Sequence, residues 1–358
     1  MRKQSRASAR LADGKVTLEM VARASGVSPS TVSRILNGTA IVSDDKRTAV
    51  DQAIAELGFV PNPIARGLAG GRTMSVGVIT QAIDSPFYGV ALRGIEEGLG
   101  RAGYSALFVS GHWNADEEKR CIETLNQRRV DGLIILHGRL SNAMLRTVAK
   151  TLPTVITGRQ LKVSNLYALD FDNVEGARLA TQHLLELGHR DIVHIAGDMA
   201  HPDAELRLRG YRLALEAAGL PFRPELVLPG MYFEDSGRLA VERLLETRQR
   251  FSAIFAANDQ MAFGAAVALH THSLRVPDDV SLVGFDDLSS AAHVVPPLTT
   301  VHQAGMELGR IAASSLLALL GGQVPDEVLP PPRLMVRAST RALASGKSSH
   351  SPRRAPPR

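Results

Sequence analysis

Asn258 and Asp286, which stand just after apolar runs of the sequence, could bind a small molecule through hydrogen bonds. If both runs are strands of one parallel sheet, their carboxyl ends share an edge and the two side chains converge on one cleft. An amide and a carboxylate each make paired hydrogen bonds, which suits a polyhydroxylated ligand. Their neighbours Asp259 and Asp287 are expected to serve as cap or hinge residues.

An aromatic pair, Phe87 and Tyr88, follows the first apolar run, Val76–Thr80. This position is the carboxyl end of the first predicted strand, where open α/β sheets bind ligands. Both rings are therefore candidate stacking walls of the same cleft. A place in the hydrophobic core is an equally good interpretation of Phe87.

The stretch from Thr17 to Asn37 carries a different chemistry. Arg34 is the one long hydrogen-bond donor of the helical pattern that follows Ser28, and a guanidinium suits bidentate contact with guanine in the major groove of DNA. Thr31, Ser33 and Asn37 have short polar side chains suited to phosphate contacts, which position a protein without specifying sequence. The alternative is a helical hairpin that packs against protein, with Arg34 as a surface charge.

Three short helical patterns must position these side chains. A serine or threonine stands at the N-cap position of each: Thr17, Ser28 and Ser43. Gly26 permits the tight turn between the first two patterns, and Gly58 follows the third. We therefore predict an all-α helix-turn-helix domain over residues 17–60.

The two ends of the chain are basic and the middle is acidic. The net charge is +5 over residues 1–72, +5 over residues 341–358 and −5 over residues 73–340. A basic head on an acidic body suggests that the head faces a polyanion, although a solvated basic surface is the alternative. Residues 1–16 and 341–358 lack apolar periodicity and are expected to be a disordered arm and tail.

From Met74 onward, apolar runs alternate with amphipathic helical patterns, which indicates parallel sheets covered on both faces. About a dozen such runs are too many for one typical sheet. We therefore predict a two-lobed α/β domain over residues 74–340. The lobe boundary is expected near 160–168, where a polar stretch interrupts the pattern, and the chain is expected to cross back near 290–300.

Several classes of protein are not expected. No apolar run reaches the ~20 residues that span a bilayer, and no apolar stretch follows the basic N-terminus. The single Cys121 fits a reducing cytoplasm. No phosphate-binding loop or Gly-x-Ser-x-Gly elbow is present, and His183, His189 and His194 lack the spacing of zinc ligands. We predict no enzymatic activity, no metal and no cofactor.

The helix-turn-helix resembles that of the lactose-repressor/galactose-repressor family of bacterial transcription regulators. The resemblance is carried by Gly26-Val27-Ser28, Thr31-Val32-Ser33-Arg34 and Leu36-Asn37 at unbroken spacing. It implies that Pro29 and Ser30 read base edges. The resemblance continues to Thr340 and implies a periplasmic-binding-protein-like sensor domain with a ligand cleft between its lobes.

Residues 61–73 resemble the hinge helix of this family. Ala65 and Leu68 would share one face of such a helix. In the family, paired hinge helices lie in the minor groove and a leucine at the position of Leu68 wedges between base pairs, which kinks the duplex. A glycine-rich linker is the alternative, and both interpretations hold if the segment folds only on DNA.

The resemblance also implies an effector site. Arg207 matches the effector-binding arginine of the family, and Asn258 and Asp286 match positions that bind effector hydroxyls. Arg159 and Tyr232 are further candidates. For Arg207, the alternative is a surface salt bridge with the first turn of its own helix.

Together these implications lead us to expect a cytoplasmic, nucleoid-associated homodimeric repressor that binds a pseudo-palindromic operator. A sugar or sugar phosphate would release it from carbohydrate-utilisation genes. A corepressor-dependent repressor is the alternative within the family. A solute-binding protein of a transporter would share the lobes, but it requires export, which residues 1–72 contradict. A sugar-modifying enzyme would need a positioned acid–base pair, and none is evident.

Overall fold

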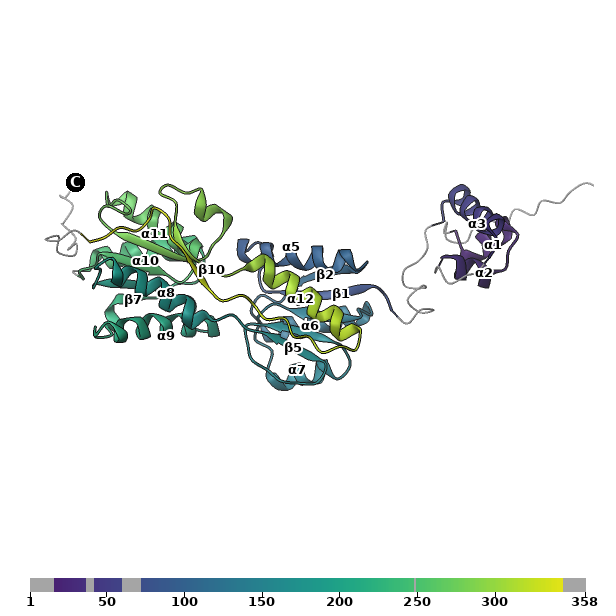
Figure 1. Cartoon of the computed structure of the whole chain (residues 1–358), viewed down its shortest axis with the longest axis horizontal. Coiled ribbons are helices and arrows are strands. Elements are labelled where there is room, and N and C mark those ends of the chain that lie inside the picture. Colours follow the sequence, from purple (N-terminus) through teal and green to yellow (C-terminus); the bar gives the residue numbers. More distant parts are fainter. Residues whose placement is uncertain (1–15, 37–41, 60–71, 248, 344–358) are drawn as a thin grey trace, which may run out of the picture. The chain divides into compact units, whose positions relative to one another are not determined.

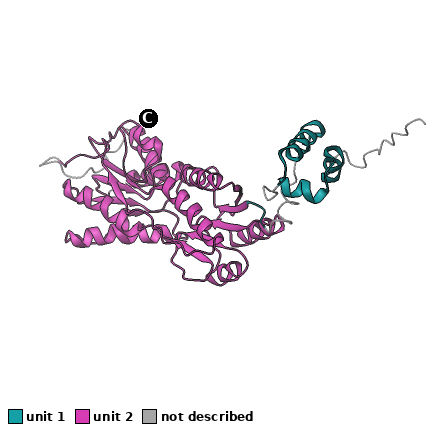
Figure 2. Cartoon of the chain, turned by 45° about the vertical axis from the view of Figure 1, so that its right-hand side comes forward, with its two compact units in different colours: residues 1–74 teal, residues 75–358 magenta. Residues whose placement is uncertain are grey.

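The chain divides into two compact units, residues Met1–Met74 and Ser75–Arg358, which are coloured separately in Figure 2. The computed structural model describes residues 16–36, 42–59, 72–247 and 249–343. The arm over 1–15, most of the tail and nearly all of the predicted hinge therefore lie outside the described residues.

Three helices make up the described part of the first unit: α1 (Leu18–Ser25), α2 (Pro29–Leu36) and α3 (Asp44–Leu57) (Figure 1). Gly26 ends α1 in the left-handed conformation, with φ of 71°, which lets the chain turn directly into α2. A small core is shared by the three helices and contains Val21, Ala22, Val32, Ile35, Val50 and Ala53. The predicted helix-turn-helix is confirmed.

Two of the three predicted helix caps are made by side chains. The Thr17 hydroxyl accepts a hydrogen bond from the Met20 amide at 3.4 Å, and the Ser28 hydroxyl accepts one from the Thr31 amide at 3.2 Å. Ser43 precedes α3 as predicted, but its side chain makes no capping hydrogen bond.

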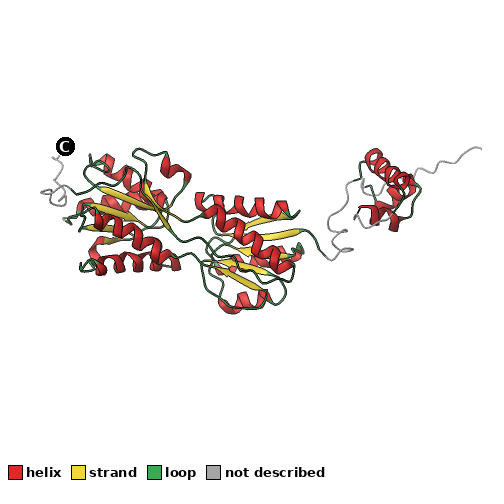
Figure 3. Cartoon of the chain, viewed as in Figure 1, coloured by secondary structure: helices red, strands yellow, loops and turns green. Residues whose placement is uncertain are grey.

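The second unit contains two sheets, each with helices on both faces (Figure 3). The first sheet has the order β2-β1-β3-β4-β5, and all its strands are parallel. Its strands are β1 (Ser75–Thr80), β2 (Ser105–Ser110), β3 (Gly132–Ile135), β4 (Thr154–Thr157) and β5 (Leu166–Leu169). The helices of this lobe are α5 (Pro86–Arg101), α6 (Ala115–Gln127), α7 (Asn142–Ala149) and α12 (Gly305–Leu320).

The second sheet has the order β11-β10-β9-β8-β6-β7, and only β11 runs antiparallel to its neighbour. Its strands are β6 (Ile192–Ile195), β7 (Val227–Leu228), β8 (Ala253–Ala256), β9 (Ser281–Asp286), β10 (Thr299–His302) and β11 (Arg333–Met335). Its helices are α8 (Asn173–Glu186), α9 (Pro202–Ala217), α10 (Glu234–Glu246) and α11 (Asp259–Thr271), with short 3₁₀ turns η1 (Pro224–Leu226) and η2 (Ser289–Ala292). The predicted two-lobed α/β architecture is confirmed.

The crossings between the lobes fall later than the sequence predicts. The boundary expected near 160–168 lies after Leu169, because the short strand β5 still pairs with β4. The return expected near 290–300 lies after His302, because β10 pairs with β9 in the second sheet. A further crossing follows α12 and brings β11 back to β10. Short strands of this kind carry too little apolar sequence to be assigned to a sheet without their partners.

Three pairs of helices approach so closely that only glycine fits at the contact. A β-carbon on Gly94 of α5 would collide with the Met306 carbonyl of α12, and one on Gly309 of α12 would collide with the Ala91 carbonyl of α5. The pairs α8 with α9 and α10 with α11 are built in the same way. This packing fixes the strand ends that carry the polar side chains described below.

Candidate functional site

In the first unit, α2 turns its predicted base-reading residues outward. Pro29, Ser30 and Arg34 are exposed, whereas Thr31 and Ser33 are half-buried. The opposite face of the helix is buried through Val32 and Ile35. The Arg34 guanidinium donates a hydrogen bond to the Ser30 carbonyl at 3.3 Å, so it lies along the exposed face of the helix. Three other predicted DNA contacts, Asn37, Ala65 and Leu68, lie outside the described residues.

In the second unit, a cavity of about 560 Å³ is lined by both lobes. This volume is within the range of pockets that hold drug-sized molecules. The lining residues lie at the carboxyl ends of the strands, as expected for parallel sheets. They are Ala82, Asp84, Ser85, Phe87, Tyr88, His112, Trp113, His137, Arg139, Asp198, His201, Asp203, Arg207, Met231, Tyr232, Phe233, Asn258, Gln260, Asp286 and Gln303.

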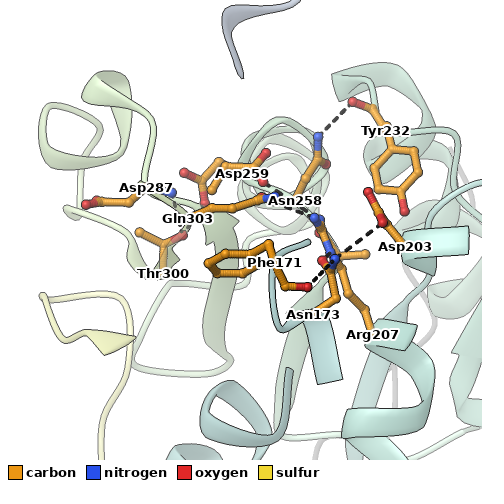
Figure 4. A network of polar contacts seen from close by, with 12 residues as sticks. Phe171, Asn173, Asp203, Arg207, Tyr232, Asn258, Asp259, Asp287, Thr300 and Gln303 are labelled. Atoms are coloured by element: carbon orange, nitrogen blue, oxygen red, sulfur yellow. Dashed lines mark hydrogen bonds and ion pairs between the residues drawn. The ribbon is translucent and has the colours of Figure 1, made fainter. Parts of the chain in front are cut away.

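Arg207, from α9, is the buried centre of the polar network in this cavity (Figure 4). Its guanidinium donates to the Asn173 side chain at 2.8 Å, to the Gln303 side chain at 3.2 Å and to the Ala257 carbonyl. Only 4% of the residue is exposed. The alternative of a surface salt bridge within its own helix is therefore wrong, and Arg207 faces the cavity as predicted.

Asp286, the last residue of β9, lies 3.7 Å from the Arg207 guanidinium. The same guanidinium lies over the Phe285 ring at 3.8 Å from its centroid, a cation–π contact. Burial raises the pKa of Asp286 to about 7, although Arg207 acts in the opposite direction. The charge of this carboxyl is therefore sensitive to what fills the cavity.

Asn258 lines the cavity, but much of its hydrogen-bonding capacity is used within the protein. Its carbonyl oxygen caps α11 by accepting from the Met261 amide at 3.0 Å, and its amide group donates to the Tyr232 carbonyl at 2.9 Å. The Tyr232 ring is parallel to His201, with 5.6 Å between centroids. Within the described part of the chain, the buried Tyr232 hydroxyl has no hydrogen-bond partner.

The two neighbouring aspartates hold loops in place, which agrees with the hinge role expected for them. Asp259 is fully buried and accepts hydrogen bonds from the Thr300 hydroxyl at 2.5 Å and the Leu288 amide at 2.8 Å. Asp287 pairs with Arg337 at 2.6 Å and with His302 at 2.9 Å. Neither lines the cavity.

Phe87 and Tyr88 both line the cavity from the start of α5. Their rings meet edge to face at 5.4 Å, and Tyr88 meets the His137 ring in the same way at 5.9 Å. Phe87 also packs against the core of the first lobe. Phe87 therefore lies both at the cavity and against the core, and its role as a stacking wall for a ligand stays a prediction.

Arg159, a weaker candidate for effector binding, is not among the residues that line the cavity. Its guanidinium donates to the carbonyls of Leu140 at 2.7 Å and Gly138 at 2.5 Å, and so braces the loop after β3 from behind. Glu118 holds the same loop by accepting from the amides of Arg139 and Leu140.

Sequence reasoning missed the residues that meet across the cleft. The rings of Trp113, from the first lobe, and His201, from the second, are stacked with 3.7 Å between centroids. His137 lies 3.3 Å from Asp203, and the loop carrying His137 also carries Arg139, 4.0 Å from Asp198. Trp113, His137 and Asp198 each follow a strand (β2, β3 and β6), so the strand-end rule that found Asn258 could have found them.

Within the described ranges, no group of three or more His, Cys, Asp or Glu side chains could hold a metal ion. Among the helices that the structure describes, none is long and apolar enough to cross a membrane.

Comparisons with known proteins agree with this geometry. Residues 17–62 match the family model of bacterial regulatory proteins of the lacI family, and residues 181–340 match that of the periplasmic binding protein-like domain. The HTH-type transcriptional repressor PurR of Haemophilus influenzae is 34% identical over 334 residues, which cover 91% of this chain and 99% of that protein.

Two solved structures are also similar. The lac repressor dimer bound to operator and the anti-inducer ONPF has 32% identity and a TM-score of 0.82, and the match covers 92% of this chain and all of that one. The complex of the transcriptional regulator CelR with cellobiose has 36% identity and a TM-score of 0.67, with coverage of 91% and 100%.

A helix-turn-helix unit joined in one chain to a two-lobed α/β unit with a ligand-sized cleft defines a DNA-binding regulator with an effector domain. The chain belongs to the lacI family of bacterial regulatory proteins. It is a ligand-responsive transcriptional repressor and not an enzyme.

Proposed function

We propose that this repressor controls carbohydrate-utilisation genes and leaves its operator when a sugar or sugar phosphate binds in the cleft. The buried network of Arg207 carries the proposal, since it places the guanidinium, the Asp286 carboxylate and the Gln303 amide at one cavity, which the Asn258 amide also lines. Such groups make paired hydrogen bonds with neighbouring hydroxyls. The similarity to a regulator solved with cellobiose supports the same ligand class.

We propose further that the protein acts as a homodimer on a pseudo-palindromic operator of nucleoid DNA in the cytoplasm. Two α2 helices related by a two-fold axis would read two half-sites, because the symmetry of the protein is mirrored in its site. Similarity to a lac repressor solved as a dimer on its operator supports this arrangement. Pro29, Ser30 and Arg34 would contact bases, and Thr31, Ser33 and Asn37 would contact phosphates.

The hinge proposal concerns Ala65 and Leu68, in the minor groove. Leu68→Ala should weaken binding to the operator while leaving effector affinity intact, because only the wedge between base pairs is lost. Unchanged operator affinity of this variant would remove Leu68 from the DNA contact.

A gel-shift experiment on the DNA upstream of the gene tests the proposed function. A specific shift at moderate salt that is reversed by a sugar supports an inducer-released repressor. A shift that requires added ligand would instead support the corepressor mechanism. Absence of any specific shift, with or without added sugar, would contradict the proposal that the operator lies upstream of this gene.

A further inference from the structure

We propose that the cleft takes an uncharged polyhydroxylated ligand and discriminates against its phosphate esters. This inference rests on the proposed function and narrows the ligand class of the same site. It follows from the ion pairs and hydrogen bonds that the charged side chains lining the cavity already make within the protein.

Carboxylates outnumber guanidinium groups around the cavity. Among the lining residues, the acidic side chains are Asp84, Asp198, Asp203 and Asp286, and the cationic ones are Arg139 and Arg207. A phosphate ester brings a charge of about −1.5 to −2 at neutral pH. It would have to enter a space already rich in negative charge, where juxtaposed like charges cost binding energy.

Both arginines already have partners. All three nitrogens of the Arg207 guanidinium donate hydrogen bonds within the protein, and its charge is paired with Asp286. Arg139 faces Asp198 across the cleft at 4.0 Å. A phosphate that reached either guanidinium would have to share it with a carboxylate and would therefore lie close to a like charge.

In the second lobe, the helix ends at the cavity already hold polar or acidic side chains of the protein. The N-terminus of a helix attracts anions through its free amides and its dipole. Asp203 lies in the first turn of α9, and Glu234 and Asp235 lie in the first turn of α10. At α11, the Asn258 side chain already accepts from an end amide, and Asp259 follows. At α9 and α10 the first turn therefore already carries a carboxylate, and at α11 the Asn258 side chain occupies an end amide. The first turn of α5, which also reaches the cavity, carries no acidic residue.

The imidazoles do not restore a positive site. His137 faces Asp203 at 3.3 Å, and His201 faces Asp198 at 3.5 Å. Burial lowers the pKa of His201, which favours its neutral form. The remaining lining histidine, His112, lies 3.4 Å from the Ser110 hydroxyl.

The same lining suits hydroxyl groups. Carboxylates accept hydrogen bonds from hydroxyls without an opposing charge, and the Tyr232 hydroxyl is a buried polar group for which the described chain provides no partner. The rings of Tyr88, Trp113 and Tyr232 supply apolar faces for the carbon skeleton of a ligand.

Trp113 provides the readout, because it is the only tryptophan of the chain and lines the cleft against His201. Tryptophan fluorescence of the full-length protein would be titrated with a panel of matched pairs, such as glucose with glucose 6-phosphate and cellobiose with its 6′-phosphate, and with inorganic phosphate. We expect at least one unphosphorylated sugar to bind, and its ester to bind about tenfold more weakly or worse. An ester that binds equally or more tightly overturns the inference, as does a panel in which no unphosphorylated sugar binds.

Asp198→Asn tests the charge argument directly, because it frees Arg139 from its partner. We expect this variant to bind the ester or inorganic phosphate several-fold better than the wild type. Asp191→Asn is the matched control, since it removes a carboxylate paired with Arg223 outside the cleft and should leave anion affinity unchanged. Equal anion affinity in all three proteins overturns the argument.

Salt dependence provides a measurement that needs no variant. The affinity for an uncharged sugar should change less than about twofold between 50 and 500 mM NaCl, whereas an anion's affinity should fall. Two outcomes separate this inference from the proposed function. A sugar phosphate that binds tightly and releases DNA would overturn the inference but agree with the proposed function. A neutral sugar that binds without affecting operator binding would agree with the inference but contradict the proposed function.

Discussion

His137 of the first lobe and Asp203 of the second lie 3.3 Å apart, with only 9% and 15% of their side chains exposed. The contact joins the loop after β3 to the first turn of α9. Burial alone would raise the pKa of Asp203, but His137, Arg207 and His201 together hold it below its ordinary value. The contact therefore favours the ionised carboxylate and joins the two lobes across the cleft.

Asp203→Asn should lower the free energy of unfolding at pH 7 by about 1–3 kcal/mol, because buried His137 and Arg207 lose a charged partner. Since the pKa of Asp203 is lowered in the folded protein, its contribution is present above the ordinary value of 3.8 and lost as the pH falls below it. The difference between variant and wild type in urea unfolding should therefore shrink below pH 4. The more exposed pair of Asp191 and Arg223 is the control, and Asp191→Asn should cost less than about 1 kcal/mol.

His194→Phe should make the protein less sensitive to acid. His194 is stacked between Tyr211 and Phe255, its Nδ1 donates to the Phe255 carbonyl, and burial lowers its pKa from 6.5 to about 4. The unfolded chain therefore binds a proton before the folded protein does, and stability falls as the pH drops from 6.5 to 4, by up to about 3 kcal/mol.

Urea unfolding across that pH range measures the effect. The variant should lose less stability on acidification than the wild type, even if it is less stable at pH 7 because the hydrogen bond to Phe255 is gone. His272→Gln, at an exposed position after α11, is the control and should keep the wild-type slope. The same slope in all three proteins would mean that His194 is not the residue responsible.

Gly94→Ala and Gly89→Ala should have opposite effects, although both glycines lie in α5. A β-carbon at Gly94 meets the Met306 carbonyl of α12, so the two helices must separate, at a cost of about 1–3 kcal/mol. Nothing lies within 4 Å of a β-carbon at Gly89, so alanine there should stabilise the helix by about 0.5–1 kcal/mol. Thermal unfolding of the two variants compares them. If both substitutions destabilise the protein, α5 does not accept alanine at either glycine, and the contact with the Met306 carbonyl is not the specific cause.

Arg207→Ala should abolish the response to effector while the protein still binds operator, since Arg207 organises Asn173, Gln303 and Asp286 around the cavity. Effector affinity, read from Trp113 fluorescence, should fall by more than about tenfold. Arg159→Lys, which alters a guanidinium behind the same cleft, is the comparison and should retain a response. A normal response of Arg207→Ala would exclude Arg207 from effector binding.

The sequence predicts the fold and much of the cleft because both depend on local pattern. Strand–helix alternation indicates the two sheets, and strand ends locate Phe87, Tyr88, Asn258 and Asp286. The apolar run Val76–Thr80, predicted as the first strand, lies within β1.

What the sequence does not reveal is the pairing of residues across the two lobes. Trp113 meets His201, and His137 meets Asp203, only because two independent sheets face each other, and no periodicity in the sequence records that arrangement. Arg159 shows the converse case. It follows β4 closely, but its guanidinium donates to carbonyls of the loop after β3 and does not line the cavity.

Arg34→Ala should weaken binding to the operator by about 1–3 kcal/mol and relax the preference at one base pair in each half-site, because a bidentate contact with guanine carries sequence information. Arg34 lies on the exposed face of α2, one helical turn after Ser30, and the helix itself is held by Val32 and Ile35 on its other face. The substitution should therefore leave the fold of the first unit intact.

Competition gel shifts with operators changed one base pair at a time measure this preference. The variant should bind a random duplex nearly as well as the wild type does, since most phosphate contacts remain. Thr31→Ala is the matched comparison, and it should weaken binding to all sequences alike. If Arg34→Ala instead weakens every duplex equally, Arg34 contacts the phosphate backbone, and base reading falls to Pro29 and Ser30.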